Sequence, residues 1–257
     1  GAPISTLDLT NSQIGSLTLS GLQFLNDSGL KLDGCSRITG LVMSNVPQIT
    51  KLDISPLLSL QSLDINSCKN ITELNLSNSH LSSLMLQLCD NLSKIDLTNC
   101  KGSVLNSLAL QTVYGLKKLI LTGASSDNGI HVLLPKFKSS STTTERYNAL
   151  TEFKASGSNL VEVYYDISSR ASSIEDAVID LSPLTNLNSC AFGDNKMMRE
   201  VSGFYYTGSI SQMFNSCTEL KSVSGVITNC GNISSAFAYD YKLTNLTGLS
   251  FVNSTAT

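Results

Sequence analysis

Residues 71–100, ITELNLSNSHLSSLMLQLCDNLSKIDLTNC, contain one short pattern written three times. Each copy has two apolar residues separated by one residue, and a Ser or Cys follows three residues later. The copies are Leu74–Leu76–Ser79, Leu84–Leu86–Cys89 and Ile95–Leu97–Cys100. Because another apolar residue stands three positions before each copy, a unit of about eleven residues recurs without a break. Such repetition is typical of a solenoid, in which successive coils stack on one another.

The same apolar pairs extend over most of the first half of the chain. They occur at 7/9, 17/19, 30/32, 41/43, 52/54, 63/65, 74/76, 84/86, 95/97, 108/110 and 119/121. From Leu30 onward, every second pair lies 21 to 24 residues further along, which predicts coils of about 22 residues with two strands each. Gly or Asn, which tolerate a left-handed turn, stands two residues after seven of these pairs. The predicted fold is therefore a β-rich solenoid with two short parallel sheets.

This pattern resembles the leucine-rich repeat, L-x-x-L-x-L-x-x-N/C-x-L, which reads here as Leu81, Leu84, Leu86, Cys89 and Leu92. The short coils look most like those of gut Bacteroides surface proteins and internalin-like proteins. The chain departs from that pattern in having no long segment that would form a helical outer side, so we expect a thin, two-sheeted solenoid and not a helix-backed horseshoe.

A second repeat type occupies the C-terminal part of the chain. Residues 209–230, SISQMFNSCTELKSVSGVITNC, align with residues 232–253, NISSAFAYDYKLTNLTGLSFVN. The Ser-led segments predict short helical turns, each placing an aromatic ring in the core. Met213, Phe214 and Cys217 resemble the BspA-like repeats of bacterial surface proteins.

We therefore expect one continuous solenoid with three stretches: regular coils at 1–124, coils with two inserted loops at 125–186, and BspA-like coils at 187–257. The inserted loops lie around the Ser/Thr run 139–144 and around SSRASSIEDA, residues 168–177. Long insertions in repeat proteins often carry binding, but they can equally be tolerated surface loops.

The strand pattern predicts two different outer faces, because residues flanking inward positions point outward. One face is charged, and the other carries small residues together with Val42 and Met85. The candidate ligand-binding residues of the charged face are Lys51, Asp53, Glu73, Asn75, Lys94, Asp96 and Lys118. The alternative is a solvated sheet whose opposite charges form weak cross-strand pairs. Tyr205, Tyr206, Tyr239 and Tyr241 are candidates for sugar stacking, with burial between coils as the alternative.

The seven cysteines form no CxxC pair. Four of them, Cys35, Cys68, Cys89 and Cys100, fall at the same repeat position. We interpret them as a column of buried thiols that pack as small hydrophobic groups. A disulfide between Cys68 and Cys89 remains conceivable, because the two residues can lie on successive coils.

Composition and motifs argue against several classes of function. With 17 basic and 20 acidic residues the net charge is −3, which gives no electrostatic reason to expect nucleic acid or an anionic membrane as a partner. No apolar run is long enough to span a membrane. The two histidines, His80 and His131, lie outside any metal-binding or triad motif, and no phosphate loop, nucleotide fingerprint or nucleophile elbow is present. We predict no enzyme activity, no cofactor and no metal.

The family resemblance implies a secreted or surface-exposed bacterial protein that binds a protein or polysaccharide, with adhesion or host interaction as its role. The expected location is extracellular or at the outer-membrane surface. The repeat pattern already begins at Ile4, which suggests that a leader or an upstream segment has been removed. Two alternatives are a structural spacer that presents another domain and, less favoured, a carbohydrate-active enzyme.

Overall fold

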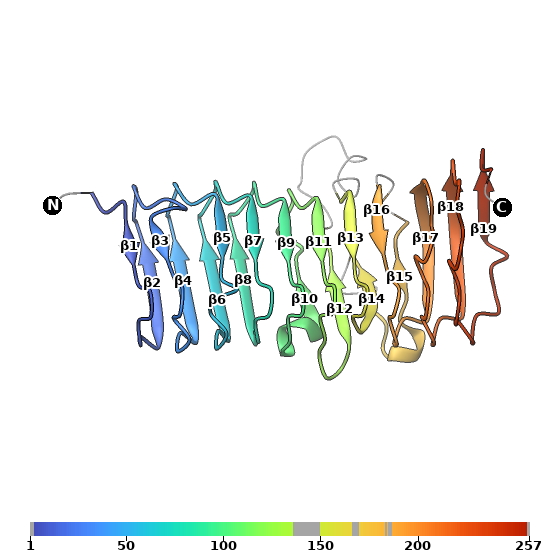
Figure 1. Cartoon of the computed structure of the whole chain (residues 1–257), viewed down its shortest axis with the longest axis horizontal. Helices are drawn as coiled ribbons and strands as arrows, with labels where there is room; N and C mark the ends of the chain where they lie inside the picture. The colour runs from blue at the N-terminus through green and yellow to red at the C-terminus, as the bar shows by residue number, and fades with distance from the viewer. Residues whose placement is uncertain (1–2, 136–149, 166–169, 183, 185–186, 256–257) are drawn as a thin grey trace.

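The computed structural model describes residues 3–135, 150–165, 170–182, 184 and 187–255, and these residues form a parallel β-solenoid. The coils follow one another along the long axis, with the two termini at opposite ends (Figure 1). Every paired strand runs parallel to its neighbour one coil away; for example, Leu52, Leu74, Ile95 and Leu119 are successive partners. The predicted fold class is therefore confirmed.

Over residues 7–164 successive strands alternate between sheets, as the spacing of the apolar pairs predicts, whereas further along the chain consecutive strands also lie in the same sheet. A two-stranded sheet pairs β1 (Leu7–Asp8) with β3 (Leu30–Lys31). A four-stranded sheet has the order β2 (Ser16–Ser20), β4 (Gly40–Ser44), β6 (Ser62–Asn66) and β8 (Ser83–Gln87).

Two larger sheets complete the solenoid. The six-stranded sheet has the order β5 (Lys51–Asp53), β7 (Glu73–Asn75), β9 (Lys94–Asp96), β11 (Lys118–Ile120), β13 (Glu152–Lys154) and β16 (Ser189–Ala191). The seven-stranded sheet has the order β10 (Leu108–Ala109), β12 (Ile130–Leu133), β14 (Leu160–Tyr164), β15 (Ile179–Asp180), β17 (Glu200–Thr207), β18 (Ser222–Thr228) and β19 (Leu249–Val252). Short 3-10 helices, η1 (Ser103–Ser107) and η4 (Ile174–Asp176), join some of these strands.

Residues with a left-handed backbone conformation turn the chain at the ends of the strands. All seven Gly and Asn positions that the sequence marks for this role have a positive φ: Asn11, Gly21, Gly34, Asn45, Asn78, Asn99 and Gly123. The equivalent positions of two further coils hold Ser67 and Leu88, whose φ values are 56° and 53°. The turn geometry is thus a property of the coil, and it persists where the residue type does not favour it.

The core is a continuous stack of inward Leu, Ile and Cys side chains, which becomes aromatic towards the C-terminus. Phe192, Phe214 and Phe237 stack on one another with ring centroids 5.6 and 5.4 Å apart. The expectation that an aromatic ring enters the core of these coils is confirmed, because Phe214 is fully buried.

The C-terminal coils contain hydrogen-bonded turns where the sequence predicts short helical turns. The Met213 N–H donates to the Ile210 carbonyl at 3.0 Å, and the Cys217 N–H donates to the Phe214 carbonyl at 3.1 Å. Gln212 and Ser216 adopt a left-handed backbone, with φ values of 56° and 62°. A left-handed residue cannot continue a right-handed helix, so the segment forms successive tight turns.

The solenoid pattern resumes after the first insertion, as predicted, with β13 and β14. The Ser/Thr run 139–144 lies outside the described residues. The described part of the second insertion includes Arg170 to Ala177 and contains η4. All five residues of β14 are buried, because Arg170 and Ala171 lie over its outer side.

Candidate binding surfaces

The outer face of the six-stranded sheet brings the predicted charged residues together in two rows. In the first row, Lys51, Glu73, Lys94, Lys118 and Glu152 are successive cross-strand partners. Lys51 Nζ lies 2.7 Å from Glu73 Oε1, and Lys118 Nζ lies 3.3 Å from Glu152 Oε2. Lys154 also pairs with Glu152. These contacts lower the pKa of Glu73 and of Glu152, because the neighbouring ammonium groups favour the carboxylate form.

The second row, Asp53, Asn75 and Asp96, has a local structural role. Each side-chain oxygen accepts a hydrogen bond of 2.9 to 3.0 Å from the backbone N–H two residues further on, and so closes the turn that ends the strand. Asp8, Asp180 and Asn245 make the same contact in other coils. The sequence signal for this role is the spacing Asp/Asn-x-Ser/Thr, which all six of these residues share.

Lys94 stands out in the first row, because its neighbour on β11 is another lysine. Lys94 and Lys118 are direct cross-strand partners. Among the described residues, Lys94 has no ion pair within 4.0 Å. A hollow of about 240 Å³ lies at this place, lined by Glu73, Ser93, Lys94, Lys117 and Lys118.

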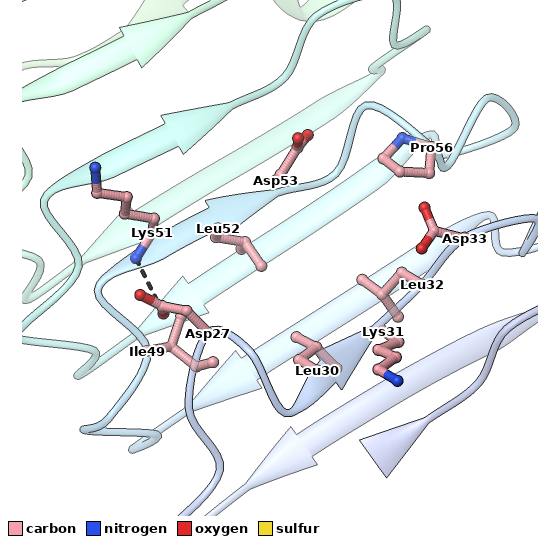
Figure 2. Close-up of a pocket in the computed structure, with 10 residues that line it drawn as sticks. All are labelled: Asp27, Leu30, Lys31, Leu32, Asp33, Ile49, Lys51, Leu52, Asp53 and Pro56. Atoms are coloured by element: carbon pink, nitrogen blue, oxygen red, sulfur yellow. Dashed lines mark hydrogen bonds between the residues drawn. The ribbon is translucent and has the colours of Figure 1, made fainter. Parts of the chain in front are cut away.

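A second hollow, of about 180 Å³, lies between β3 and β5, where the ladder of parallel strands is interrupted. Figure 2 shows Asp27, Asp33 and Asp53 around it, together with Lys31 and Lys51. Lys31 pairs with Asp8 at 3.3 Å and Lys51 with Glu73, so both ammonium groups are already engaged.

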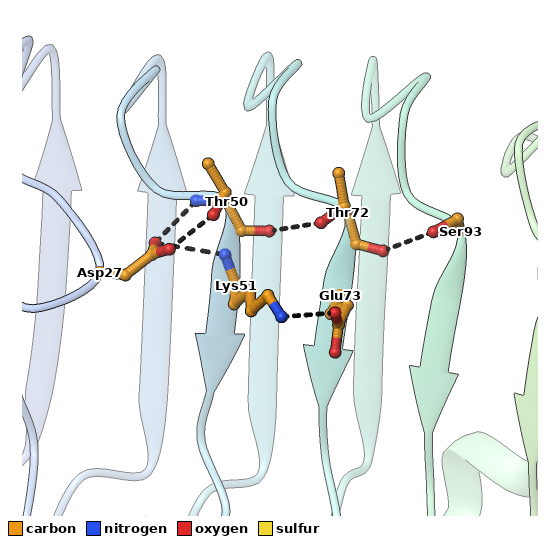
Figure 3. Close-up of polar contacts among 6 residues, drawn as sticks. All are labelled: Asp27, Thr50, Lys51, Thr72, Glu73 and Ser93. Carbon is orange, nitrogen blue, oxygen red and sulfur yellow. Dashed lines mark hydrogen bonds and ion pairs between the residues drawn. The ribbon is translucent and has the colours of Figure 1, made fainter.

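Asp27 closes the interrupted ladder from the side. Its carboxylate accepts hydrogen bonds from the N–H groups of Thr50, at 2.7 Å, and Lys51, at 3.2 Å (Figure 3). In the following coils a backbone carbonyl has this role: the Thr50 carbonyl accepts from the N–H groups of Thr72 and Glu73. The hydroxyls of Thr72 and Ser93 add a further bond to each preceding coil, at 3.1 Å. Asp27 therefore satisfies donors that would otherwise lack a partner.

The outer face of the four-stranded sheet carries the small and weakly apolar residues that the sequence predicts. Val42 and Met85 are 39% and 45% exposed, and both are cross-strand partners of Asp64. Asp64 Oδ1 is buried and has no hydrogen-bond partner. The two apolar side chains thus flank one carboxylate on an otherwise Ser-rich surface.

The four candidate tyrosines do not share one environment. Tyr206 is only 8% exposed, its ring stacks on Phe204 with centroids 5.5 Å apart, and its hydroxyl donates to the Asn188 carbonyl at 3.4 Å. It is a core residue and presents no face to a sugar. Tyr205, Tyr239 and Tyr241 are exposed, and the rings of the last two lie 6.3 Å apart. These three retain the accessibility that stacking requires.

A buried charged cluster on β12 and β14 was missed by sequence reasoning. His131 Nδ1 lies 2.9 Å from Glu162 Oε2, and Arg170 Nε lies 3.5 Å from the same oxygen. Glu162 Oε1 accepts the Ala171 N–H at 2.6 Å, and Arg170 also donates to the Asn106 carbonyl at 3.0 Å. Both carboxylate oxygens are therefore engaged in holding the second insertion against the sheet. Repeat analysis could not find the cluster, because its members lie in and beside the insertions.

The cysteines are free thiols, and the four at the shared repeat position are buried. Thiol groups of Cys35, Cys68 and Cys89 donate to backbone carbonyls one coil back. Burial raises the pKa of Cys89 to about 11 and that of Cys217 to about 12. The interpretation as a column of buried thiols is confirmed, and the structure holds no Cys68–Cys89 disulfide.

No group of three or more His, Cys, Asp or Glu side chains among the described residues is placed to hold a metal ion. None of the helical segments described has the length and hydrophobicity of a membrane span.

Comparison with known proteins gives matches to solved structures alone. No protein-family model and no curated sequence matches this chain. The functional domain of InlJ from Listeria monocytogenes, which includes a cysteine ladder, matches with 16% identity and a TM-score of 0.30, covering 95% of this chain and 54% of that one. An internalin, InlF, from the same organism matches with 13% identity and a TM-score of 0.24, over 95% and 87% of the two chains. A leucine-rich repeat protein from Leptospira interrogans matches with 14% identity and a TM-score of 0.19, over 100% and 92%. The chain thus spans about half the length of the InlJ domain.

Proposed function

We propose that this chain is a non-catalytic binding module that recognises a protein or polysaccharide through the outer face of its six-stranded sheet. The observation that carries the proposal is that the outward residues of all six strands are at least partly exposed and stand in register. A flat surface of this kind offers rows of polar groups at the spacing of adjacent strands, about 4.8 Å. Solenoids commonly use such extended surfaces to bind macromolecules.

Adhesion or host interaction at the bacterial surface, or after secretion, is the role that we propose for this module. The support is the repeat pattern itself, which resembles internalin-like coils and, around Met213, Phe214 and Cys217, BspA-like repeats. The division into stretches 1–124, 125–186 and 187–257 belongs to this proposal. Neither a nucleic acid nor a membrane is proposed as partner, because the net charge of −3 provides no general attraction to polyanions.

The test is a binding screen on a glycan array and on an array of extracellular matrix proteins. The variant Lys51→Ala/Glu73→Ala/Lys94→Ala removes polar groups from the first row and leaves the turn-closing Asp53, Asn75 and Asp96 in place. We expect a ligand of the native protein to be lost in this variant while its circular dichroism spectrum is unchanged. The matched control is Thr18→Ala/Ser62→Ala on the four-stranded sheet, which should bind normally.

Three outcomes would count against the proposal. Equal binding by the triple variant would exclude the six-stranded face, and no binding on either array would favour a structural spacer that presents another domain. Turnover of any member of a polysaccharide panel would favour the third possibility, a carbohydrate-active enzyme.

A further inference from the structure

The register of β9 and β11 places two like charges opposite each other. Lys94 and Lys118 are cross-strand partners, and adjacent strands lie only about 4.8 Å apart. Like charges in directly opposite positions destabilise a sheet. Lys117, the residue before β11, lines the same hollow, so three lysines border one place.

The neighbouring carboxylates neutralise this cluster only in part. Glu73 is engaged by Lys51 at 2.7 Å, and Glu152 is shared between Lys118, at 3.3 Å, and Lys154. Lys94 and Lys117 have no ion pair within 4.0 Å among the described residues. The hollow of about 240 Å³ therefore has three lysines and one glutamate on its walls, with Ser93 as its remaining lining residue.

We propose that this hollow binds a carboxylate of an acidic protein segment, so that the partner's anion lies between Lys94, Lys117 and Lys118. The inference rests on the proposed function and specifies what the six-stranded face recognises. An anion at this position would be attracted by the lysines that line the hollow, two of which the register of the sheet places opposite each other.

An acidic protein fits this face better than an acidic polysaccharide. The outward positions of the six strands contain no aromatic residue on which a sugar ring could stack: they are Lys51, Asp53, Glu73, Asn75, Lys94, Asp96, Lys118, Ile120, Glu152, Lys154, Ser189 and Ala191. Ile120 of β11 and Ala191 of β16 instead add apolar side chains to the same face, of the kind that a peptide side chain can contact.

The test measures binding of a fluorescent (Gly-Glu)₅ peptide by anisotropy, with (Gly-Gln)₅ as the uncharged probe and a sulfated heparin oligosaccharide as the competing source of anions. The variant is Lys94→Gln/Lys117→Gln/Lys118→Gln, and the matched control is Lys69→Gln/Lys101→Gln, which removes two exposed lysines outside this sheet. We expect the glutamate peptide to bind the native protein and the control, to bind the variant at least about tenfold more weakly, and to weaken as salt rises. Shifts of the ¹³C-methylated ammonium signals of Lys94 and Lys118 on addition of the peptide would place it in the hollow.

Three results would overturn the inference. They are the absence of saturable binding of the glutamate peptide, an equal loss of affinity in the control, and tighter binding of the heparin oligosaccharide at matched charge. The array screen separates this site from the proposed function. A ligand that is lost in the Lys51→Ala/Glu73→Ala/Lys94→Ala variant but survives the triple glutamine substitution would support the proposed function and exclude the carboxylate site.

Discussion

Glu162 connects two strands to an insertion, and its burial makes that connection energetically important. It is 2% exposed and contacts His131, Arg170 and the Ala171 N–H. Removing one partner from a buried ion pair leaves the others desolvated and unpaired. We expect Glu162→Ala to lower the free energy of unfolding by about 3 kcal/mol in urea denaturation. Glu175→Ala, an exposed glutamate in η4, is the control and should cost less than about 0.5 kcal/mol; equal effects would show that the cluster is not an anchor.

Asp240 makes the free energy of unfolding depend on pH. Burial raises its pKa to about 6, and Oδ2 has no hydrogen-bond partner. In the unfolded chain the pKa of an aspartate is about 3.9. Between about pH 6 and pH 4, Asp240 is therefore protonated in the folded protein but still ionised in the unfolded chain. The free energy of unfolding should therefore increase as pH falls from 7 to 4, by up to about 3 kcal/mol from this group. In urea titrations at pH 7 and pH 4.5, Asp240→Asn should remove this contribution, so the native protein should gain stability relative to the variant as the pH falls. Asp127→Asn, at an exposed site, should keep the pH dependence of the native protein.

At the scale of the coil, the turn after β8 contains the residue that fits its conformation least well. Leu88 has a φ of 53° and is 57% exposed, so it bears the steric cost of a left-handed backbone without adding to the core. Asn is the residue type at the same place in the coils of Asn45, Asn78 and Asn99. We expect Leu88→Asn to raise the free energy of unfolding by about 1 kcal/mol, measured by thermal and urea denaturation. Asn78→Ala should lower it by a similar amount, and a destabilised Leu88→Asn protein would contradict the argument.

Strands could be predicted from the sequence where successive coils repeat the same apolar residues at the same positions. The spacing of Leu52, Leu74 and Ile95 alone places these residues in one sheet, because a strand's inward positions recur with the period of the coil. Ser67 and Leu88 adopt left-handed turns that their residue types do not indicate, since stacking between coils overrides local preference. The role of Asp27 as a hydrogen-bond acceptor for the next coil could not be predicted either, because it depends on the absence of strand pairing between β3 and β5.

The candidate site was predictable to a smaller extent. The register brings Lys51, Glu73, Lys94 and Lys118 into one row, as the alternation of strands predicts. Which charges neutralise one another depends on side-chain geometry, so the unpaired state of Lys94 could be seen only in three dimensions. His131 and Glu162 lie 31 residues apart in the sequence, with the first insertion between them, and Arg170 lies in the second insertion. No periodic signal in the sequence relates these residues to one another.

At the scale of the whole molecule, each strand pairs only with strands of adjacent coils, so perturbations should remain local. Phe214 lies between Phe192 and Phe237 in the aromatic stack. Phe214→Ala should cost about 3–5 kcal/mol locally, because it removes a ring from the middle of that stack and leaves a cavity. We expect hydrogen exchange in β17 and β18 to accelerate in this variant, while β4, β6 and β8 retain native protection at low denaturant. Phe251→Ala, 43% exposed on β19, is the control and should change exchange little. Equal loss of protection in β4–β8 would show that the solenoid opens as one cooperative unit.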